Sequence, residues 1–287
     1  MDLIDFTNLP QKKKSYGGAN GNKRCVVIDN ELYMLKLPSH TKRNDDLPYT
    51  NSSISEYLGS HIFNLLGICA QETILGNYLH NNVNRMCVAC KDFEKENFNL
   101  MDFASVKNQI IDSKSNGYGT DLNDIIETIE NQNIMDPVSL SDYFWDMFVV
   151  DALLGNWDRH NGNWGFLYNQ ETDEVKLAPV FDCGSCLFPQ IDDPMIIKVL
   201  KEKQLFNARV YDFPTSAIVL RGKRINYYSF IKAHEYPECD KAIKRLKKKI
   251  DFNRIDELID SVNCISENHR LFLKKIIHAR YEVFFEN

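Results

Sequence analysis

Three polar side chains between Asp151 and Cys186 constrain what this chain can fold into. Asp158 is followed five residues later by Asn163, and Asp182 comes after a short connecting passage. Each of the three is expected in a loop that follows an apolar run. Two carboxylates and one amide act together only if the fold brings their loops to one place. We therefore expect the rest of the chain to build a scaffold around them.

The elements predicted around these residues would hold the loops together. Residues 137–154 have the aromatic-rich apolar pattern of a buried helix, and Gly155 is placed to end it directly before Asp158. Residues 164–180 are predicted to form a hairpin of two strands. Such a hairpin carries the polar residues that flank it to the same end of a sheet.

The chemistry that fits this set is phosphoryl transfer from ATP bound with magnesium. One Asp orients and deprotonates the attacking hydroxyl, an Asn holds a metal ion, and a second Asp bridges that ion to the phosphates. Mg²⁺ takes few protein oxygens and leaves the rest of its shell to water and phosphate. We therefore predict ATP and Mg²⁺ as cofactors, Asp158 as the catalytic base, and Asn163 and Asp182 as metal ligands. Protein kinases have the same gap between the Asp and the Asn of their catalytic loop.

His160 lies between these two residues and is a second candidate catalytic residue. Its ring could relay a proton, because imidazole titrates near neutral pH. The alternative is a hydrogen bond from the ring to the backbone of the loop. A position inside a short loop of polar residues favours the structural role.

The segment from Ser15 to Gly21 is a candidate phosphate-binding turn. Glycines permit close approach of the backbone, and a turn of this kind can point several N–H groups at a phosphate. The alternative is an ordinary hairpin loop. Strands are predicted at residues 24–28 and 31–37, with a turn at Asp29-Asn30. The candidate phosphate-binding residues are Gly17, Gly18, Ala19, Asn20 and Gly21.

A lysine and a glutamate follow in the order that protein kinases use. Lys36 stands among apolar neighbours in a predicted strand, where it could either neutralise nucleotide phosphates or face solvent. Residues 52–66 have the apolar spacing of a helix, with Ser52 or Ser53 as its N-cap, and they carry Glu56 in the first turns. The order of turn, strand lysine and helix glutamate predicts an ion pair at the nucleotide.

Two lobes are expected. Residues 1–93 would form a small β-rich lobe, with further strands at 73–79 and 85–90 and a hinge at Phe93. Residues 94–287 would form a larger helical lobe.

Two stretches of the larger lobe carry specific expectations. Residues 102–133 are predicted to form a polar loop followed by one amphipathic helix. The chain from Pro189 onward is predicted to be helical throughout. A run of basic residues at 240–250 keeps ordinary amphipathic spacing, so a solvated helix face is favoured over a docking face.

Charge and hydropathy exclude two classes of protein. A net charge of −6 and a pI near 5.7 argue against a nucleic-acid binder with a broad basic face. No window of about 18 apolar residues exists, which excludes a membrane-spanning helix. The basic residues of the N-terminus follow its apolar residues, which is the wrong order for a secretory signal. We expect a cytoplasmic protein, with secretion of an effector without a classical signal as the alternative.

Eight cysteines in a chain without a signal peptide predict reduced thiols. Two pairs, Cys87/Cys90 and Cys183/Cys186, have the CxxC spacing of a structural zinc site. The first pair lies in an apolar strand and the second overlaps the loop of Asp182. A zinc ion joining them would lie across the nucleotide cleft, so free thiols are favoured.

These motifs together resemble the HipA-like serine/threonine kinases from Ser15 onward. The DxHxxN pattern of that family is matched by Asp158, His160 and Asn163, and its metal-binding Asp by Asp182. Its phosphate loop, a serine followed by small residues, resembles residues 15–20. The chain departs from full-length HipA because no N-terminal subdomain precedes this loop.

The resemblance implies an α+β, two-lobed fold of the kind that protein kinases and phosphoinositide kinases share. It implies Lys36 as the nucleotide lysine, a hinge at Lys91 and Phe93 that binds ATP, and autophosphorylation at Ser15. It also implies a protein substrate, such as an aminoacyl-tRNA synthetase or another translation factor. A small antitoxin or a protein that supplies the missing subdomain would be its partner, in a toxin–antitoxin system or as a bacterial effector.

The sequence also fits two other functions. The run Asp158-Arg159-His160 with Asn163 also resembles the DRHxxN of phosphoinositide lipid kinases. Against that function, the chain has no apolar membrane insertion and no basic segment to grip an anionic bilayer. The third function is a nucleotide-binding pseudokinase that acts as an interaction module. The intact set of Lys36 and the three loop residues argues against it.

Overall fold

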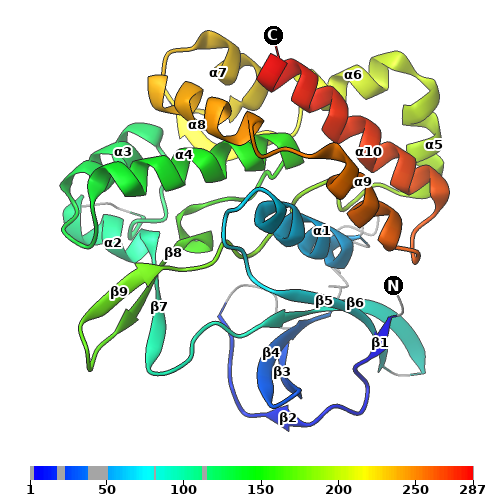
Figure 1. Cartoon of the computed structure of the whole chain (residues 1–287), viewed down its shortest axis with the longest axis horizontal. Coiled ribbons are helices and arrows are strands. Elements are labelled where there is room, and N and C mark those ends of the chain that lie inside the picture. The colour runs from blue at the N-terminus through cyan, green and yellow to red at the C-terminus, as the bar shows by residue number, and fades with distance from the viewer. Residues whose placement is uncertain (1–2, 18–22, 38–50, 81, 112–114, 287) are drawn as a thin grey trace.

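A six-stranded sheet forms one end of the molecule (Figure 1). The computed structural model describes residues 3–17, 23–37, 51–80, 82–111 and 115–286. All neighbouring strands are antiparallel except β1 and β5, in the order β1-β5-β6-β4-β3-β2. The strands are β1 (Ile4–Asp5), β2 (Gln11–Lys12), β3 (Lys23–Ile28), β4 (Glu31–Lys36), β5 (Thr73–His80) and β6 (Val83–Lys91).

The hairpin of β3 and β4 confirms the predicted turn. Asp29 and Asn30 both have positive φ, at 49° and 64°. Two successive residues with a left-handed backbone give a turn whose twist matches that of paired strands. Asp and Asn adopt this conformation more readily than most residues.

Side chains on both faces of the sheet are buried. Successive side chains of a strand point to opposite sides, so one strand contributes to two clusters. On β6, Cys87 and Ala89 pack with Phe6 in one small cluster, whereas Val88 and Cys90 belong to the main core. Helix α1 (Ser52–Leu65) covers the second face. The chain leaves this sheet after β6, and the boundary between the lobes at residue 93 stays a prediction.

Helix α1 begins at Ser52, so its N-cap lies one residue before the serines that we expected to cap it. Its N-cap is Asn51, and no side chain there caps the helix by a hydrogen bond. Asn51 instead donates its backbone N–H to Pro189 O at 3.0 Å and its side chain to Ile191 O at 2.7 Å. The prediction of Ser52 or Ser53 as N-cap was wrong, because this contact with the other lobe decides where the helix starts.

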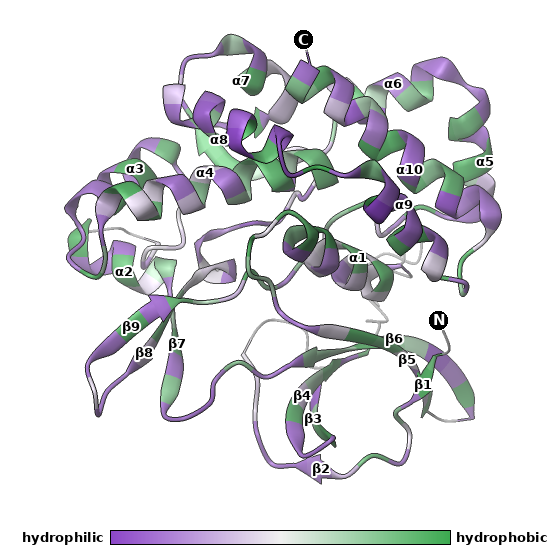
Figure 2. Cartoon of the chain, in the orientation of Figure 1, coloured by the Kyte–Doolittle hydropathy of each residue, from purple (hydrophilic) through white to green (hydrophobic). Residues whose placement is uncertain are grey.

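Helix α4 (Pro137–Leu154) runs through the middle of the second lobe, with α3, α8 and α10 packed against it (Figure 1). The Asp136 side chain accepts a hydrogen bond from Ser139 N and caps the helix, and Gly155 ends it with a φ of 66°. Figure 2 shows apolar residues gathered where the helices of this lobe face one another. The prediction of this helix is confirmed.

The remaining elements of the second lobe surround α4 and its loop. They are β7 (Phe98–Asp102), α2 (Phe103–Ile110), α3 (Leu122–Asn131), a 3-10 turn (Asn161–Asn163), β8 (Gly165–Asn169), β9 (Glu174–Leu177), α5 (Asp193–Lys201), α6 (Lys203–Tyr211), β10 (Thr215–Leu220), β11 (Lys223–Asn226), α7 (Tyr227–Ala233), α8 (Pro237–Lys247), α9 (Phe252–Ser261), α10 (Glu267–Tyr281) and a final π-helical turn (Glu282–Glu286).

Two predictions for this lobe were wrong. The predicted loop from residue 102 contains a helix, because residues 103–110 form α2, which buries Phe103 against Trp164. The short α2 includes a buried lysine, which hides its amphipathic pattern. The chain after Pro189 is not helical throughout, since β10 and β11 form a hairpin. Its β-branched residues prefer strands when they pack on a neighbouring surface.

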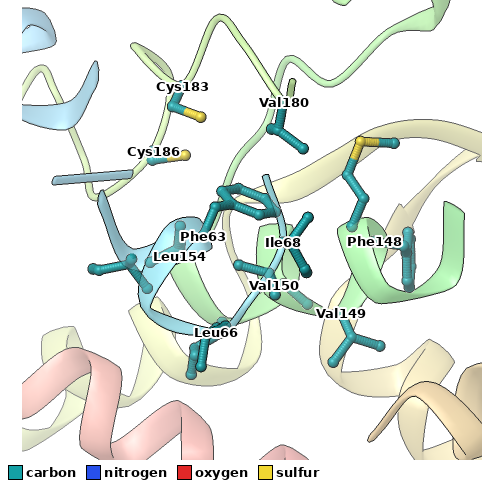
Figure 3. Packing of buried hydrophobic residues seen from close by; sticks show 14 of the residues in the cluster. Phe63, Leu66, Ile68, Phe148, Val149, Val150, Leu154, Val180, Cys183 and Cys186 are labelled. Atoms are coloured by element: carbon teal, nitrogen blue, oxygen red, sulfur yellow. The ribbon is translucent and has the colours of Figure 1, made fainter. Parts of the chain in front are cut away.

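One hydrophobic core continues from α1 into the second lobe (Figure 3). Phe63 of α1 and Ile68 after it pack with Val150 of α4 and with Val180, which precedes the loop of Asp182. The two lobes are therefore joined through α1 beside the predicted site. Within the described ranges, no helix is both long and apolar enough to cross a membrane.

Candidate functional site

The loop after α4 holds Asp158, His160 and Asn163 in one tight turn. The carbonyl oxygen of Asp158 accepts hydrogen bonds from His160 N and from Asn163 Nδ2, both at 2.9 Å. The His160 ring accepts a hydrogen bond from Gly162 N at 3.0 Å through Nδ1. The ring of His160 thus shapes the loop backbone.

The Asp158 side chain lies half-buried with no counter-charge in contact. In the described part of the chain, no hydrogen bond or ion pair engages its carboxylate. Burial raises the pKa of Asp158, and the charge of Asp182 raises it further, although His160 acts in the opposite direction. A carboxylate with free lone pairs and a raised pKa suits a general base.

The hairpin of β8 and β9 brings Asp182 to the same end of the sheet as Asn163. Its strands pair from Phe166 with Leu177 to Asn169 with Glu174. Ala178 N donates to Gly165 O at 3.0 Å, which continues the pairing towards the catalytic loop. Asp182 has a φ of 58°, which turns the chain sharply away from the strand.

Lys36 connects three segments at the centre of the site. Its Nζ lies 2.9 Å from Glu56 Oε2 of α1 and 2.8 Å from Asp182 Oδ1. Burial alone would lower the pKa of Lys36, but the charges of Asp182 and Glu56 raise it well above its ordinary value. The same contact lowers the pKa of Asp182 to about 2. Lys36 and Asp182 are therefore both charged at neutral pH.

A buried ion pair that we did not predict supports both loops. Arg159 Nε lies 2.9 Å from Asp151 Oδ2 of α4, and both residues are almost fully buried. The Arg159 guanidinium also donates to Asn163 O at 2.8 Å and to Phe181 O. The sequence signal was an arginine inside the catalytic loop, but only the fold shows that it bridges α4 and both loops.

The start of the glycine segment is tied to the hinge. Tyr16 OH donates to Asp92 Oδ2 at 2.9 Å, and Lys14 Nζ lies 2.6 Å from the same oxygen. Ser15 between them is exposed. The predicted residues Gly18, Ala19, Asn20 and Gly21 lie outside the described residues, whereas Gly17 lies inside them.

Lys23 is a further residue that sequence reasoning missed. It stands directly opposite Lys36 in the pairing of β3 and β4, so both side chains are on one face of the sheet. Lys23 Nζ donates to Gly17 O. Burial and the nearby charge of Lys36 lower the pKa of Lys23. Only the strand register could have identified it.

The structure separates the two predicted hinge residues. Lys91 Nζ pairs with Glu72 at 3.0 Å, and its backbone N–H also bonds to Glu72 O. This places the Lys91 side chain away from the site. The Phe93 ring instead packs on Phe181 with 5.5 Å between ring centroids, next to Asp182.

Comparison with known proteins identifies the family. The HipA-like C-terminal domain matches residues 14–262. The chain belongs to the HipA-like family. The serine/threonine-protein kinase CtkA of Helicobacter pylori is 45% identical to it over 282 residues, which are 98% of this chain and 86% of that protein.

Solved structures support the same assignment. The crystal structure of the Helicobacter pylori proinflammatory kinase CtkA matches this HipA-like chain with a TM-score of 0.93 and 44% identity, over 99% of this chain and 96% of that chain. HipA of Shewanella oneidensis, solved with HipB and operator DNA, has a TM-score of 0.53 and 12% identity, over 95% of this chain and 65% of that chain. The predicted α+β, two-lobed kinase-like fold is confirmed.

The cysteine pairs do not form a metal centre in the described parts of this HipA-like chain. No group of three or more His, Cys, Asp or Glu side chains there is placed to hold a metal ion. The Cys87 thiol donates to Gly76 O at 3.6 Å, and burial raises the pKa of Cys90. Both Cys183 and Cys186 are buried in the main core.

Proposed function

We propose that this protein is a serine/threonine protein kinase that uses ATP and Mg²⁺. The observation that carries this proposal is the contact of Lys36 with both Glu56 and Asp182, beside the loop of Asp158. Phosphoryl transfer depends on positioning and on charge stabilisation, which an ion pair of this kind supplies. The family and the close likeness to CtkA give the same class of activity.

The residues present fit a magnesium ion. Asn163 Nδ2 is engaged by Asp158 O, which leaves its oxygen for a cation, and the Asp182 carboxylate is partly exposed. One amide oxygen and one carboxylate are hard donors of the kind that Mg²⁺ takes. When bound, Mg²⁺ neutralises charge on the phosphates. Asn163 and Asp182 would hold it, and Lys36 would neutralise the α- and β-phosphates.

The Asp158 carboxylate would orient a serine or threonine hydroxyl of the substrate and accept its proton. The hydrogen bonds of the Asp158 carbonyl to His160 and Asn163 fix the loop, so the carboxylate keeps its direction. His160 acts here as a positioning residue. Lys23 would add a second positive charge where the glycine segment meets the phosphates.

The hinge would receive the adenine ring at Phe93. In the described part of the chain, neither the backbone N–H nor the C=O of Phe93 makes a hydrogen bond. Asp92 beside it is engaged with Leu32 O, Lys14 and Tyr16. Free backbone groups next to an aromatic ring suit a flat heterocycle with donor and acceptor atoms.

Labelled ATP tests the proposal directly. The protein is incubated with γ-labelled ATP and Mg²⁺ in the presence of a dephosphorylated protein substrate and phosphoinositide vesicles. Label on protein serine or threonine, lost without Mg²⁺ and in Asp158→Asn, is the expected result. Label in lipid would favour the lipid kinase, and binding of ATP without any transfer would favour the pseudokinase.

Regulation and partners extend this proposal. We infer that the kinase phosphorylates its own exposed Ser15, and that its substrate is a cytoplasmic protein such as an aminoacyl-tRNA synthetase or another translation factor. We also infer a small partner protein that binds this kinase, as HipB accompanies Shewanella HipA in a toxin–antitoxin system. Capture on the purified kinase from its own host, followed by phosphopeptide mapping, tests both inferences.

A further inference from the structure

A turn that ends at Tyr118 is anchored to the catalytic loop by buried side chains. Asn161 of that loop donates its Nδ2 to the carbonyl oxygens of Gly117 and Gly119, at 2.9 and 2.8 Å. Lys107 of α2 is fully buried and donates to Gly119 O at 2.6 Å. A buried ammonium carries a large desolvation cost unless its partners are well placed. The position of the turn is therefore strongly determined.

The Tyr118 side chain nevertheless remains 53% exposed. Its ring centroid lies 6.3 Å from that of His160 in an edge-on arrangement. The ring also covers Gly162, where an added Cβ would come within 2.8 Å of Tyr118 Cε1. A firmly held turn thus presents an aromatic face to solvent beside the loop that carries Asp158.

An acidic group without a counter-charge stands at the edge of this ring. Tyr118 OH donates to Asp102 Oδ2 at 3.3 Å. The other carboxylate oxygen, Oδ1, caps α2 by accepting from Ser105 N at 2.8 Å and Ser105 Oγ at 2.5 Å. Across the described ranges, no Lys, Arg or His forms an ion pair with Asp102, and no cation lies over the ring of Tyr118. The charge of Asp102 also raises the pKa of Tyr118.

We propose that Tyr118 and Asp102 form a subsite for a lysine or arginine side chain of the protein substrate. An aromatic face attracts a cation, and the adjoining carboxylate supplies the opposite charge. An extended chain advances about 3.3 Å per residue. Because the subsite adjoins the catalytic loop, the basic side chain is expected within a few positions of the phosphorylated residue. This inference rests on the proposed kinase function and names a substrate feature that the catalytic residues do not determine.

Peptide arrays test the subsite. Each peptide has one fixed serine, and each flanking position is varied in turn among Lys, Arg, Ala, Leu and Glu. The full-length wild type is compared with Tyr118→Ala, Tyr118→Phe and Asp102→Asn. Asparagine also caps helices well, so Asp102→Asn keeps α2 and removes only the charge. Tyr211→Ala, which removes another partly exposed tyrosine at the end of α6, is the matched control.

The wild type is expected to prefer Lys or Arg at one flanking position. Tyr118→Ala and Asp102→Asn should each reduce this preference by about two- to fivefold, which is the size of an exposed cation–π contact in the first case and of an exposed ion pair in the second. Tyr118→Phe retains the ring and should keep most of the preference, and Tyr211→Ala should keep all of it. Selection at the other positions should be unchanged in every variant.

Two results would overturn the inference. One is a wild type that phosphorylates the peptides without any basic preference, and the other is a preference that survives in both Tyr118→Ala and Asp102→Asn. Transfer of phosphate to peptides in these cases would leave the kinase function standing. A wild type that phosphorylates no peptide and no protein would instead contradict the proposed function, and the subsite with it.

Discussion

The carboxylate of Glu56 binds the backbone N–H of Cys183 at 3.1 Å through Oε1, while its other oxygen binds Lys36. Cys183 directly follows Asp182, so one buried side chain on α1 positions both the lysine and the metal loop. A shift of α1 would therefore disturb two groups of the site at once. This relationship makes Glu56 the residue on which the arrangement most depends.

The pair of Lys36 and Glu56 should behave as one unit in kinetics. Glu56→Gln and Lys36→Met should each raise the KM for ATP and lower kcat, because either change leaves its partner uncompensated. The double variant should lose less than the two single losses combined, since residues in contact are not additive. Steady-state kinetics on the four proteins measures this coupling. Strict additivity would show that Glu56 is only a structural residue of α1.

Asp158 and Asp182 should differ in what their removal abolishes. Asp158→Asn should bind ATP with Mg²⁺ almost normally and lose about 10²–10⁴-fold in turnover, as expected for a positioned base. Asp182→Ala should weaken binding that depends on the metal as well as turnover. Titration calorimetry of ATP with and without Mg²⁺ distinguishes the two. Loss of binding in the first variant and normal binding in the second would reverse the assigned roles.

The ion pair of Asp151 and Arg159 should be important for stability. Arg159→Met leaves a buried carboxylate without its partner, which costs about 3–5 kcal/mol in comparable sites. Arg221→Met, which breaks an exposed pair with Glu235, is the control and should change stability little. Urea denaturation of the three proteins checks this prediction. Equal stability of the two variants would contradict it.

Stability should fall between neutral and mildly acidic pH because of His269. This residue is 4% exposed, and burial lowers its pKa from 6.5 to about 4. The unfolded chain binds the proton first as the pH falls through 6.5, so stability is lost between about pH 6.5 and 4. A tenfold difference in proton affinity between the folded and unfolded chain is worth about 1.4 kcal/mol, so the loss amounts to about 3 kcal/mol.

Replacing His269 tests this assignment. Denaturation of His269→Gln across that pH range should show a flatter profile than that of the wild type. His234→Gln, at an exposed histidine, is the matched control for the loss of a histidine side chain. A wild-type slope in His269→Gln would show that other groups cause the acid sensitivity.

Phosphorylation of Ser15 should weaken ATP binding. A phosphate carries about −1.5 to −2 charge at neutral pH, and at Ser15 it would repel the triphosphate and disturb the predicted phosphate-binding turn. Intact-mass and peptide mapping after incubation with ATP and Mg²⁺ should locate the phosphate at Ser15. Ser15→Asp should bind ATP more weakly, and Ser15→Ala should bind it normally. Phosphate found only on other residues of an active preparation would contradict the idea.

Several features of the site were predictable because their causes are local. The capped helix that ends at Gly155, the hairpin after Asn163 and the turn at Asp29 each depend on residues close in sequence. Capping, turn preference and apolar periodicity act over a few residues, and they place Asp158 and Asp182 in loops without knowledge of the fold.

Other features were decided only by tertiary structure. Lys36 and Asp182 are separated by 146 residues, and the contact of Glu56 with Cys183 spans 127. The buried pair of Asp151 and Arg159 is separated by only eight residues. Its importance for stability comes from burial, which the apolar periodicity of the sequence does not reveal. In sequence, Lys36 fits a solvated strand face as well as a nucleotide site. The fold decides between these two environments of Lys36, because packing of α1 on the sheet removes water from its side chain and leaves Glu56 and Asp182 as its partners.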